Sequence, residues 1–268
     1  MRLARRASWA ASLLAGWLCI TVAGIDAQNP ASGAAPPSPG TLLEDLMAAN
    51  RILADQGIVD GYGHVSARSD SNPNRYFISR SLAPELVTAD DLMELDLDST
   101  PIDPRGRNSY QERFIHGEIY KARPDVMAVV HMHAPTVIPF GSSNVALRPM
   151  FHMSAFIAEG VPVFDIRDTA GMTDMLVSNA MLGAALARAL SSHPAALMRG
   201  HGAVVVGPSL PITVGRSVYL KTNAEMQAQA IALGGTVKYL DPEEARKAGT
   251  PDGYQRAWTL WRRKALGR

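Results

Sequence analysis

The spacing of hydrophobic positions predicts a chain that mixes strands and helices. The run Val126–Val130 is apolar and rich in β-branched residues, and it ends in two histidines, which is typical of a buried strand. Shorter alternating stretches at residues 61–68, 76–79 and 92–97 predict three more strands, of which the first two form a hairpin. The sheet is therefore expected to begin as antiparallel pairs and not as βαβ units.

Apolar residues at helical spacing predict several helices around these strands. The first is expected to begin at Thr41, three residues before Glu44 in a capping-box pattern, and to end at Gly57. The other predicted helices cover residues 110–122, 172–190 and 209–233, and a short one begins at about Pro242. Further apolar runs predict short strands at residues 161–164, 195–198 and 203–206.

The N-terminal segment has the composition of an export signal. Residues 1–27 combine a basic start with a long apolar run and small residues at its end, which predicts a signal peptide. A membrane anchor is the alternative, since the apolar run is of borderline length to span a bilayer. Residues 28–40 are rich in Pro, Ala, Gly and Ser and predict a flexible linker. Residues 41–268 are then left as one catalytic domain.

The composition limits where the protein can reside in the cell and which types of catalysis it can use. Cleavage after residue 27 removes Cys19, the only cysteine among 268 residues, so disulfides and thiolate catalysis are excluded in the mature protein. The formal net charge of +1 does not suggest a nucleic-acid partner. We expect a soluble periplasmic protein that keeps no stable membrane anchor after cleavage.

Histidines at strand ends suggest a metal site. Alternate side chains of a strand point to the same face, so His131 and His133 share a face and could hold one ion. Alternatively, both histidines cap the strand and bond to loop backbone. His201 stands between two glycines where one strand ends and another begins, and it would supply a third nitrogen. Three protein ligands and an open position are typical of a catalytic metal site, for which Glu112 is the natural acid or base.

The segments that carry these residues resemble the class II aldolase/adducin family. They are Glu112-Arg113-Phe114-Ile115-His116, Ala128-Val129-Val130-His131-Met132-His133 and Arg199-Gly200-His201-Gly202, in that order. The resemblance extends from about Thr41 to Leu240. It implies an α/β fold with α/β/α layers around a mainly antiparallel sheet, and a homotetramer with active sites between subunits.

The resemblance also implies the role of each site residue. It makes His131, His133 and His201 ligands of a divalent metal, usually Zn²⁺ with Mn²⁺, Co²⁺ or Fe²⁺ as alternatives, and Glu112 the acid/base. Adducin-like members lack the ligands and do not catalyse. Helical spacing places His116 on the same face as Glu112, where it would orient Glu112 or bond to structure.

Three segments depart from the sugar-phosphate aldolases of the family. Where those enzymes hold a phosphate with small polar residues, this chain has bulkier or cationic ones around His64, Arg80-Ser81 and Tyr110. Arg80 would suit a planar carboxylate. With residues 79–87 and 151–153, these departures resemble decarboxylases acting on dihydroxyphthalates and 2-hydroxy-3-carboxymuconate semialdehydes.

The predicted function is therefore a metal-dependent decarboxylase of a small carboxylate, working through a metal-stabilised enolate. Glu112 would protonate carbon, with His64 as the second possibility, and Arg80, Ser81, Tyr110 and His152 would contact the substrate. Arg80 could instead be a surface residue, and His152 a core histidine. An aldolase or dehydratase of a hydroxy-carbonyl compound, a non-catalytic adducin-like protein and an iron-dependent oxygenase remain alternatives.

Overall fold

Seven strands form the single sheet in the part of the chain that the structure describes. The computed structural model describes residues 39–267, so the predicted signal peptide and almost all of the predicted linker lie outside the described residues. The chain divides after Pro36 into two units, and the described residues belong to the second. No helix among them is long and apolar enough to cross a membrane.

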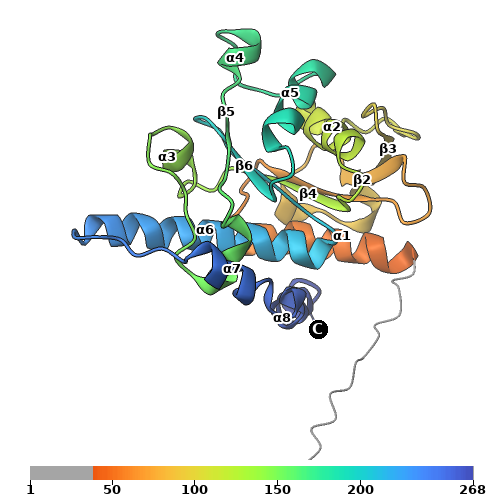
Figure 1. Ribbon diagram of the computed structural model, residues 1–268. Helices are drawn as coiled ribbons and strands as arrows, with labels where there is room; N and C mark the ends of the chain where they lie inside the picture. Colours follow the sequence, from red (N-terminus) through yellow and green to blue (C-terminus); the bar gives the residue numbers. More distant parts are fainter. Residues whose placement is uncertain (1–38, 268) are drawn as a thin grey trace, which may run out of the picture. The chain divides into compact units, whose positions relative to one another are not determined.

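The sheet has the spatial order β3-β2-β1-β4-β7-β6-β5 (Figure 1). All neighbouring strands pair antiparallel except β5 and β6, which pair parallel. The mainly antiparallel sheet is thus confirmed. The strands are β1 (His64–Arg68), β2 (Arg75–Ser79), β3 (Leu92–Asp96), β4 (Ala128–Met132), β5 (Val163–Phe164), β6 (Ala195–Met198) and β7 (Gly202–Gly207).

Helices cover both faces of the sheet. In Figure 1, α1 and α6 run beneath it with α8, and α2 and α5 lie above it. The α/β/α layering is as expected. The helices are α1 (Pro39–Asp55), α2 (Phe114–Ala122), α3 (Ile138–Gly141), α4 (Arg167–Ala170), α5 (Ala180–Leu190), α6 (Leu210–Ala232), α7 (Pro242–Ala248) and α8 (Gln255–Ala265).

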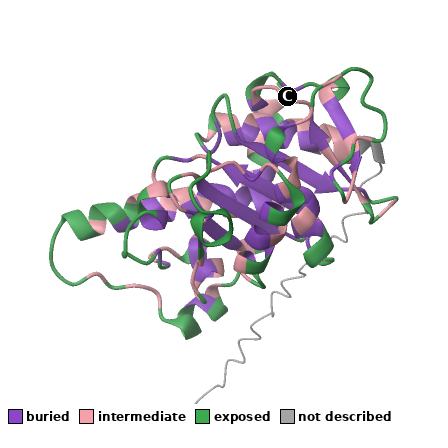
Figure 2. Cartoon of the chain, turned by 90° about the horizontal axis from the view of Figure 1, so that it is seen from above, coloured by how far each residue is buried: buried purple, intermediate pink, exposed green. Residues whose placement is uncertain are grey.

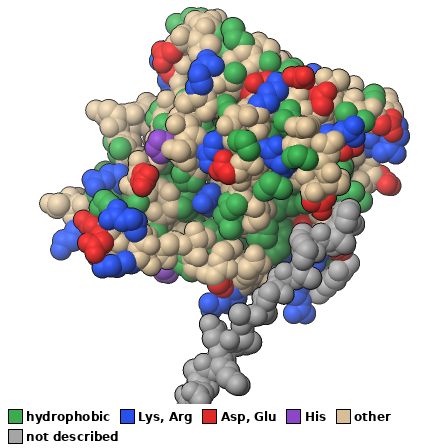
Figure 3. Space-filling view, turned by 45° about the vertical axis from the view of Figure 1, so that its right-hand side comes forward, with side chains coloured by type: hydrophobic (Ala, Val, Ile, Leu, Met, Phe, Trp, Pro, Cys, Tyr) green, Lys and Arg blue, Asp and Glu red, His purple; other side chains and the backbone are tan. Residues whose placement is uncertain are grey.

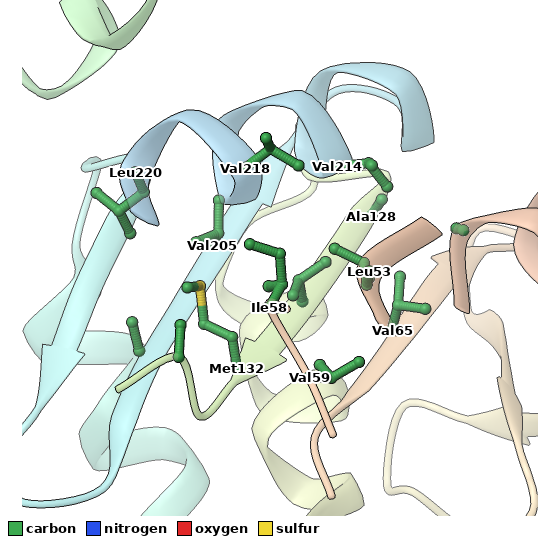
Figure 4. Close-up of a cluster of buried hydrophobic side chains, with 14 of the residues drawn as sticks. Leu53, Ile58, Val59, Val65, Ala128, Met132, Val205, Val214, Val218 and Leu220 are labelled. Carbon is green, nitrogen blue, oxygen red and sulfur yellow. The ribbon is translucent and has the colours of Figure 1, made fainter. Parts of the chain in front are cut away.

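Two hydrophobic cores follow from the alternation of side chains along the central strands. Val130 and Met132 of β4 point to the α1–α6 face, where they pack with residues such as Val205, Val214 and Leu53 (Figure 4). Val129 of the same strand points to the α2–α5 face and its separate core. The strands are accordingly the most buried part of the chain (Figure 2). By the same alternation His131 faces α2.

The predicted helix over residues 172–190 is wrong in its first half. Helix α5 begins only at Ala180, because the Asn179 side chain accepts a hydrogen bond from the Leu182 backbone N–H at 3.0 Å and caps the helix there. The residues before it form turns around Thr173 and Asp174, whose side chains bond to backbone N–H groups two residues later. This irregular segment passes over the face of the sheet that carries His131.

Helices α2 and α5 approach closely at a glycine. A Cβ added to Gly183 would lie 2.5 Å from the Phe114 carbonyl oxygen. We therefore expect Gly183→Ala to lower the free energy of unfolding by about 1–3 kcal/mol, because the two helices must separate. Urea denaturation measures this loss. Gly61→Ala is the control, since a Cβ there meets no atom within 4 Å; equal effects of the two substitutions would contradict the interpretation.

Candidate metal centre

Four predicted site residues come together at one end of the central strands. Glu112, His131, His133 and His201 each direct one ligand atom to a common point, and these atoms all lie within 4.8 Å of one another. His131 is the last but one residue of β4, and His133 follows its end. His201 immediately precedes β7. The antiparallel pairing of β4 with β7 brings the two strand ends side by side.

The distances within the cluster fit a single small ion. The Nε2 atom of His133 lies 2.9 Å from that of His131 and 3.1 Å from that of His201. Metal–nitrogen bonds of 2.0–2.1 Å place neighbouring ligand atoms of a tetrahedron about 3.3 Å apart. Three imidazole nitrogens at this spacing, with a carboxylate beside them, are a suitable donor set for a divalent metal.

The protonation of the histidines also fits metal binding. His131 Nδ1 lies 3.3 Å from the Ala203 carbonyl oxygen, which can only accept, so this nitrogen carries the proton and Nε2 keeps its lone pair for an ion. Burial and the neighbouring His131 and His201 lower the pKa of His133 to about 4. His133 is therefore neutral at physiological pH, as a metal ligand must be.

Glu112 reaches the cluster from a break in the predicted helix over residues 110–122. It lies in a single 3₁₀ turn, Gln111–Arg113, with φ −88° and ψ 19°, and the α-helix begins only after it. Its Oε2 atom lies 3.4 Å from His131 Nε2 and 3.5 Å from His201 Nε2. Its Oε1 atom accepts a hydrogen bond from the Val177 backbone N–H at 2.9 Å. The segment before α5 therefore anchors this carboxylate.

The neighbouring histidines favour the ionised form of Glu112 despite its burial. Burial acts to raise the pKa of this carboxyl, but the interactions with His131 and His201 outweigh it, so the net shift is downward. A carboxylate that is ionised and only 7% exposed can take a proton from a bound substrate.

Glycine beside His201 permits the close approach of β7 to β4. A Cβ on Gly202 would lie 1.9 Å from the Met132 carbonyl oxygen, so only glycine allows the strand to begin there. This confirms the expectation that glycine next to His201 lets backbone segments meet. It also brings the His201 imidazole next to that of His133.

His116 does not bond to Glu112 but belongs to a separate buried network. Its Nε2 atom lies 2.7 Å from His64 Nδ1, and its Nδ1 atom lies 2.6 Å from Ser66 Oγ. Ser66 Oγ in turn lies 2.8 Å from the Tyr120 hydroxyl. Burial and the neighbouring His131 lower the pKa of His116 to about 3, so this imidazole is neutral. Ser66 and Tyr120 are not marked by any sequence pattern, because their hydroxyls look ordinary in a strand and a helix.

His64 connects this network to the metal-ligand cluster. It lies opposite His131 in the β1–β4 pairing, and the two ring centroids are 5.1 Å apart. Burial, and then the neighbouring His116 and His131, lower the pKa of His64 well below its ordinary value. Since Nδ1 is engaged with His116, the Nε2 atom is the one left for a ligand.

A cavity of about 520 Å³ opens beside the cluster. His64, Tyr110, Glu112 and His133 line it together with Ser81. The Tyr110 ring lies 4.5 Å from that of His64, while its hydroxyl donates to the Leu82 carbonyl and contacts Ser79 Oγ. Tyr110 thus presents its ring to the cavity. The rest of the lining is Gly61, Tyr62, Gly63, Leu82, Ala83, Gln111 and Leu176.

Two predicted substrate contacts lie outside this cavity. Arg80 Nε donates to Asp91 Oδ1 at 2.6 Å, so its guanidinium is held on the outer side of its loop. His152 is exposed and contacts the Phe151 ring. Within one chain, neither residue reaches the cluster, which departs from the expectation for both.

Comparisons with known proteins support the resemblance. The family described as Class II Aldolase and Adducin N-terminal domain matches residues 44–228. "Decarboxylase tropJ" of Talaromyces stipitatus is 37% identical over 247 residues, which cover 83% of this chain and 93% of that protein. The 3,4-dihydroxyphthalate decarboxylase of Arthrobacter keyseri is 29% identical over 236 residues, which cover 82% of this chain and 90% of that one.

A solved structure agrees with these relatives. The L-fuculose 1-phosphate aldolase from Glaciozyma antarctica PI12 is similar with a TM-score of 0.72 and 25% identity, over 87% of this chain and 94% of that chain. Enzymes of this class use a divalent metal, and the four-residue cluster is where such an ion would bind here. The fold, the cluster and the sequence matches together assign the chain to the class II aldolase and adducin family.

Proposed function

We propose that this enzyme is a metal-dependent decarboxylase of a small hydroxylated aromatic acid or a muconate-semialdehyde-type acid. The observation that carries the proposal is the cluster of three histidines and Glu112, of which Glu112 and His133 line a cavity that also has tyrosine and leucine in its lining. Two named decarboxylases among the relatives support the same reaction class.

The chemistry needs a place for an electron pair and a source of one proton. When CO₂ leaves, the pair of the broken C–C bond stays on the substrate, and a bound divalent ion supplies a Lewis acid for the adjacent oxygen. Glu112 Oε2 takes the proton of the substrate hydroxyl and returns it to the carbon that lost CO₂. The Val177 N–H on Oε1 keeps the carboxylate in place during both transfers.

His64 has the supporting role in this proposal. Its Nε2 atom donates to, or accepts from, the substrate carboxyl group, and it is the alternative proton donor. Its orientation depends on His116, which holds the opposite nitrogen at 2.7 Å. His116 is accordingly a positioning residue that acts through His64.

Removing the His116 hydrogen bonds should lower kcat without removing the metal. We expect His116→Phe to reduce kcat about 10–100-fold, the range seen when outer partners of a metal site are lost, because His64 can then rotate. His116→Gln, which keeps polar atoms near both partners, should restore part of the rate. Steady-state kinetics with metal analysis and a melting curve test this, and Arg188→Gln, at an exposed arginine of α5, is the control. An unchanged kcat in a folded, metal-loaded His116→Phe protein would refute the positioning role.

The reaction class is tested by substrate. Purified protein is incubated with ortho-hydroxylated benzoic acids, a dihydroxyphthalate and L-fuculose 1-phosphate, and CO₂ and the organic products are measured. CO₂ release from a hydroxylated acid supports the proposal. Aldol cleavage of the sugar phosphate without CO₂ release would establish the aldolase alternative, which the similarity to the L-fuculose 1-phosphate aldolase favours.

We propose Zn²⁺ as the resident metal, since three neutral imidazole nitrogens with a carboxylate suit it. Elemental analysis of protein purified without added metal decides between Zn²⁺, Mn²⁺, Co²⁺ and Fe²⁺. One Fe²⁺ per chain with oxygen consumption would instead indicate an oxygenase. Protein without stoichiometric metal would indicate a non-catalytic, adducin-like role.

Assembly and location complete the proposal. The chain forms a homotetramer in which a second subunit covers the cavity mouth, where Tyr62 is 73% exposed. Arg80 or His152 would contact substrate only in that assembly. Light scattering measures the oligomer. The enzyme is exported to the periplasm, and fractionation with N-terminal sequencing tests both export and cleavage after residue 27.

A further inference from the structure

A second cavity lies at the opposite end of the central strands from the metal-ligand cluster. It has a volume of about 500 Å³, and its lining includes Val126 before β4 and Gly207 at the end of β7. Val126 and His131 are five positions apart in an extended part of the chain, which corresponds to about 16 Å. The two cavities share no lining residue among those described. The proposed reaction makes no use of this second cavity.

Arg216 of helix α6 is the notable side chain in this lining. Its Nη1 atom donates to the Val206 carbonyl oxygen at 2.6 Å, and the guanidinium lies 5.6 Å from the centre of the Phe156 ring. Its Nε atom is buried and has no hydrogen-bond partner among residues 39–267. No carboxylate of the described chain forms an ion pair with it. Burial lowers the pKa of this guanidinium, which reflects the cost of holding a cation away from water.

The Arg216 guanidinium can serve as an anion ligand. Nη1 is bonded to Val206 and the Nε atom is buried, so Nη2 is the donor group that remains, and guanidinium N–H groups bind carboxylate or phosphate oxygens strongly. A partly buried cation without a counter-charge is costly, and a bound anion would offset that cost.

The rest of the lining is polar and carries further charge. Arg123 is paired with Asp125 at 2.7 Å and already donates to the Ser191 carbonyl. Arg246 is exposed at the rim, as is the acidic Glu159. The hydroxyls of Ser192 and Thr250 also belong to the lining. The volume exceeds that of a simple ion and lies in the range of small-molecule sites.

We propose that this cavity is a second binding site, for a small organic oxyanion, with the Arg216 guanidinium as its principal ligand. The ligand carries a carboxylate or a phosphate group against Arg216, and its body lies along Phe156. The site is independent of the metal centre and therefore does not depend on the proposed reaction.

Calorimetry on the full, metal-loaded enzyme tests the site. Inorganic phosphate, a simple phosphate monoester and succinate are titrated separately into the wild type, Arg216→Gln and Arg188→Gln. Arg188 is an exposed arginine of α5 and serves as the matched control. We expect one of the three probes to bind the wild type and the control alike, with at least a tenfold loss of affinity in Arg216→Gln. The probe that binds identifies the anionic group.

A second variant tests the same cavity in case Arg216→Gln does not fold. Ser192 is exposed at the cavity, so Ser192→Trp should block it sterically and abolish the same binding. An anion bound at the metal centre would persist in both variants. Equal affinity in the wild type and in both variants, or no binding of any probe, would overturn the proposal. A crystal structure showing a carboxylate of a second copy on Arg216 would overturn it as well.

Discussion

His131→Ala should abolish stoichiometric metal binding and lower kcat/KM at least about 1000-fold. This side chain is fully buried, and its Nε2 atom lies next to both His133 and Glu112. Its removal leaves two nitrogens and a carboxylate, so the ion that accepts negative charge during CO₂ loss is released. Lewis-acid stabilisation of that charge supplies several kcal/mol, and each 1.36 kcal/mol corresponds to a tenfold change in rate.

Elemental analysis and steady-state kinetics of the same preparation measure both effects. Arg188→Gln serves as the control, because this arginine of α5 is exposed and belongs to neither cavity lining. A melting curve distinguishes loss of the ion from loss of the fold, since added metal should stabilise the wild type but not the variant. Activity that survives in metal-free His131→Ala protein would refute a metal-dependent reaction.

Glu112→Gln should separate proton transfer from metal binding. The amide keeps an oxygen for the Val177 N–H, and the three histidines still hold the ion, so we expect metal content to be unchanged. The amide cannot carry a proton from the substrate hydroxyl to carbon. General acid–base catalysis contributes about 10²–10⁴-fold, and kcat should fall by that factor with little change in KM.

His64→Asn is measured in parallel with Glu112→Gln. If Glu112 carries the proton, its substitution is the more damaging of the two, and deuterium from solvent at the decarboxylated carbon reports the protonation step. A Glu112→Gln enzyme with the wild-type kcat would transfer the role to His64, which is the nearest other titratable side chain in the cavity lining outside the metal ligands.

The sheet and the four-residue cluster follow from local sequence patterns. The β-branched run before His131 needs burial, and strand alternation then places His131 and His133 on one face. Gly202 signals a close backbone contact, and a close contact is found at Met132. These patterns involve residues close together in the sequence, so they can be recognised without knowledge of the tertiary fold. The roles of the residues in catalysis remain predictions.

Side-chain partners that the sequence does not reveal account for most of the differences between the sequence-based predictions and the structure. Arg80 was expected to meet a substrate, but Asp91, which lies eleven residues later, pairs with its guanidinium. Helical spacing predicts that His116 either orients Glu112 or bonds to structure, and the second holds, because the break at Glu112 gives the two side chains different partners. Asn179 could have been recognised as a helix cap before Ala180, which would have corrected the helix boundary.

Surface charge gives little guidance to either site. Figure 3 shows basic and acidic side chains interspersed over one face, in keeping with a formal net charge of +1. Both cavities depend on groups withdrawn from the surface, the histidines in one and the partly buried Arg216 in the other. Burial is a property of the folded chain, so neither the His64–His116 network nor the unpaired arginine can be inferred from composition.

The two edge strands of the sheet, β3 and β5, limit how copies of this protein can associate. On β3 the outward backbone groups are already bonded: Asp96 N–H to Thr100 and the Glu94 carbonyl to the Ile102 N–H. Arg107 likewise donates to the Leu92 carbonyl at 3.0 Å. The other border, β5, has only two residues. Neither edge strand therefore offers a long row of unpaired backbone groups to which a strand of another copy could add, which is how fibrils and swapped sheets usually form. Copies of the protein must then associate through helices and loops.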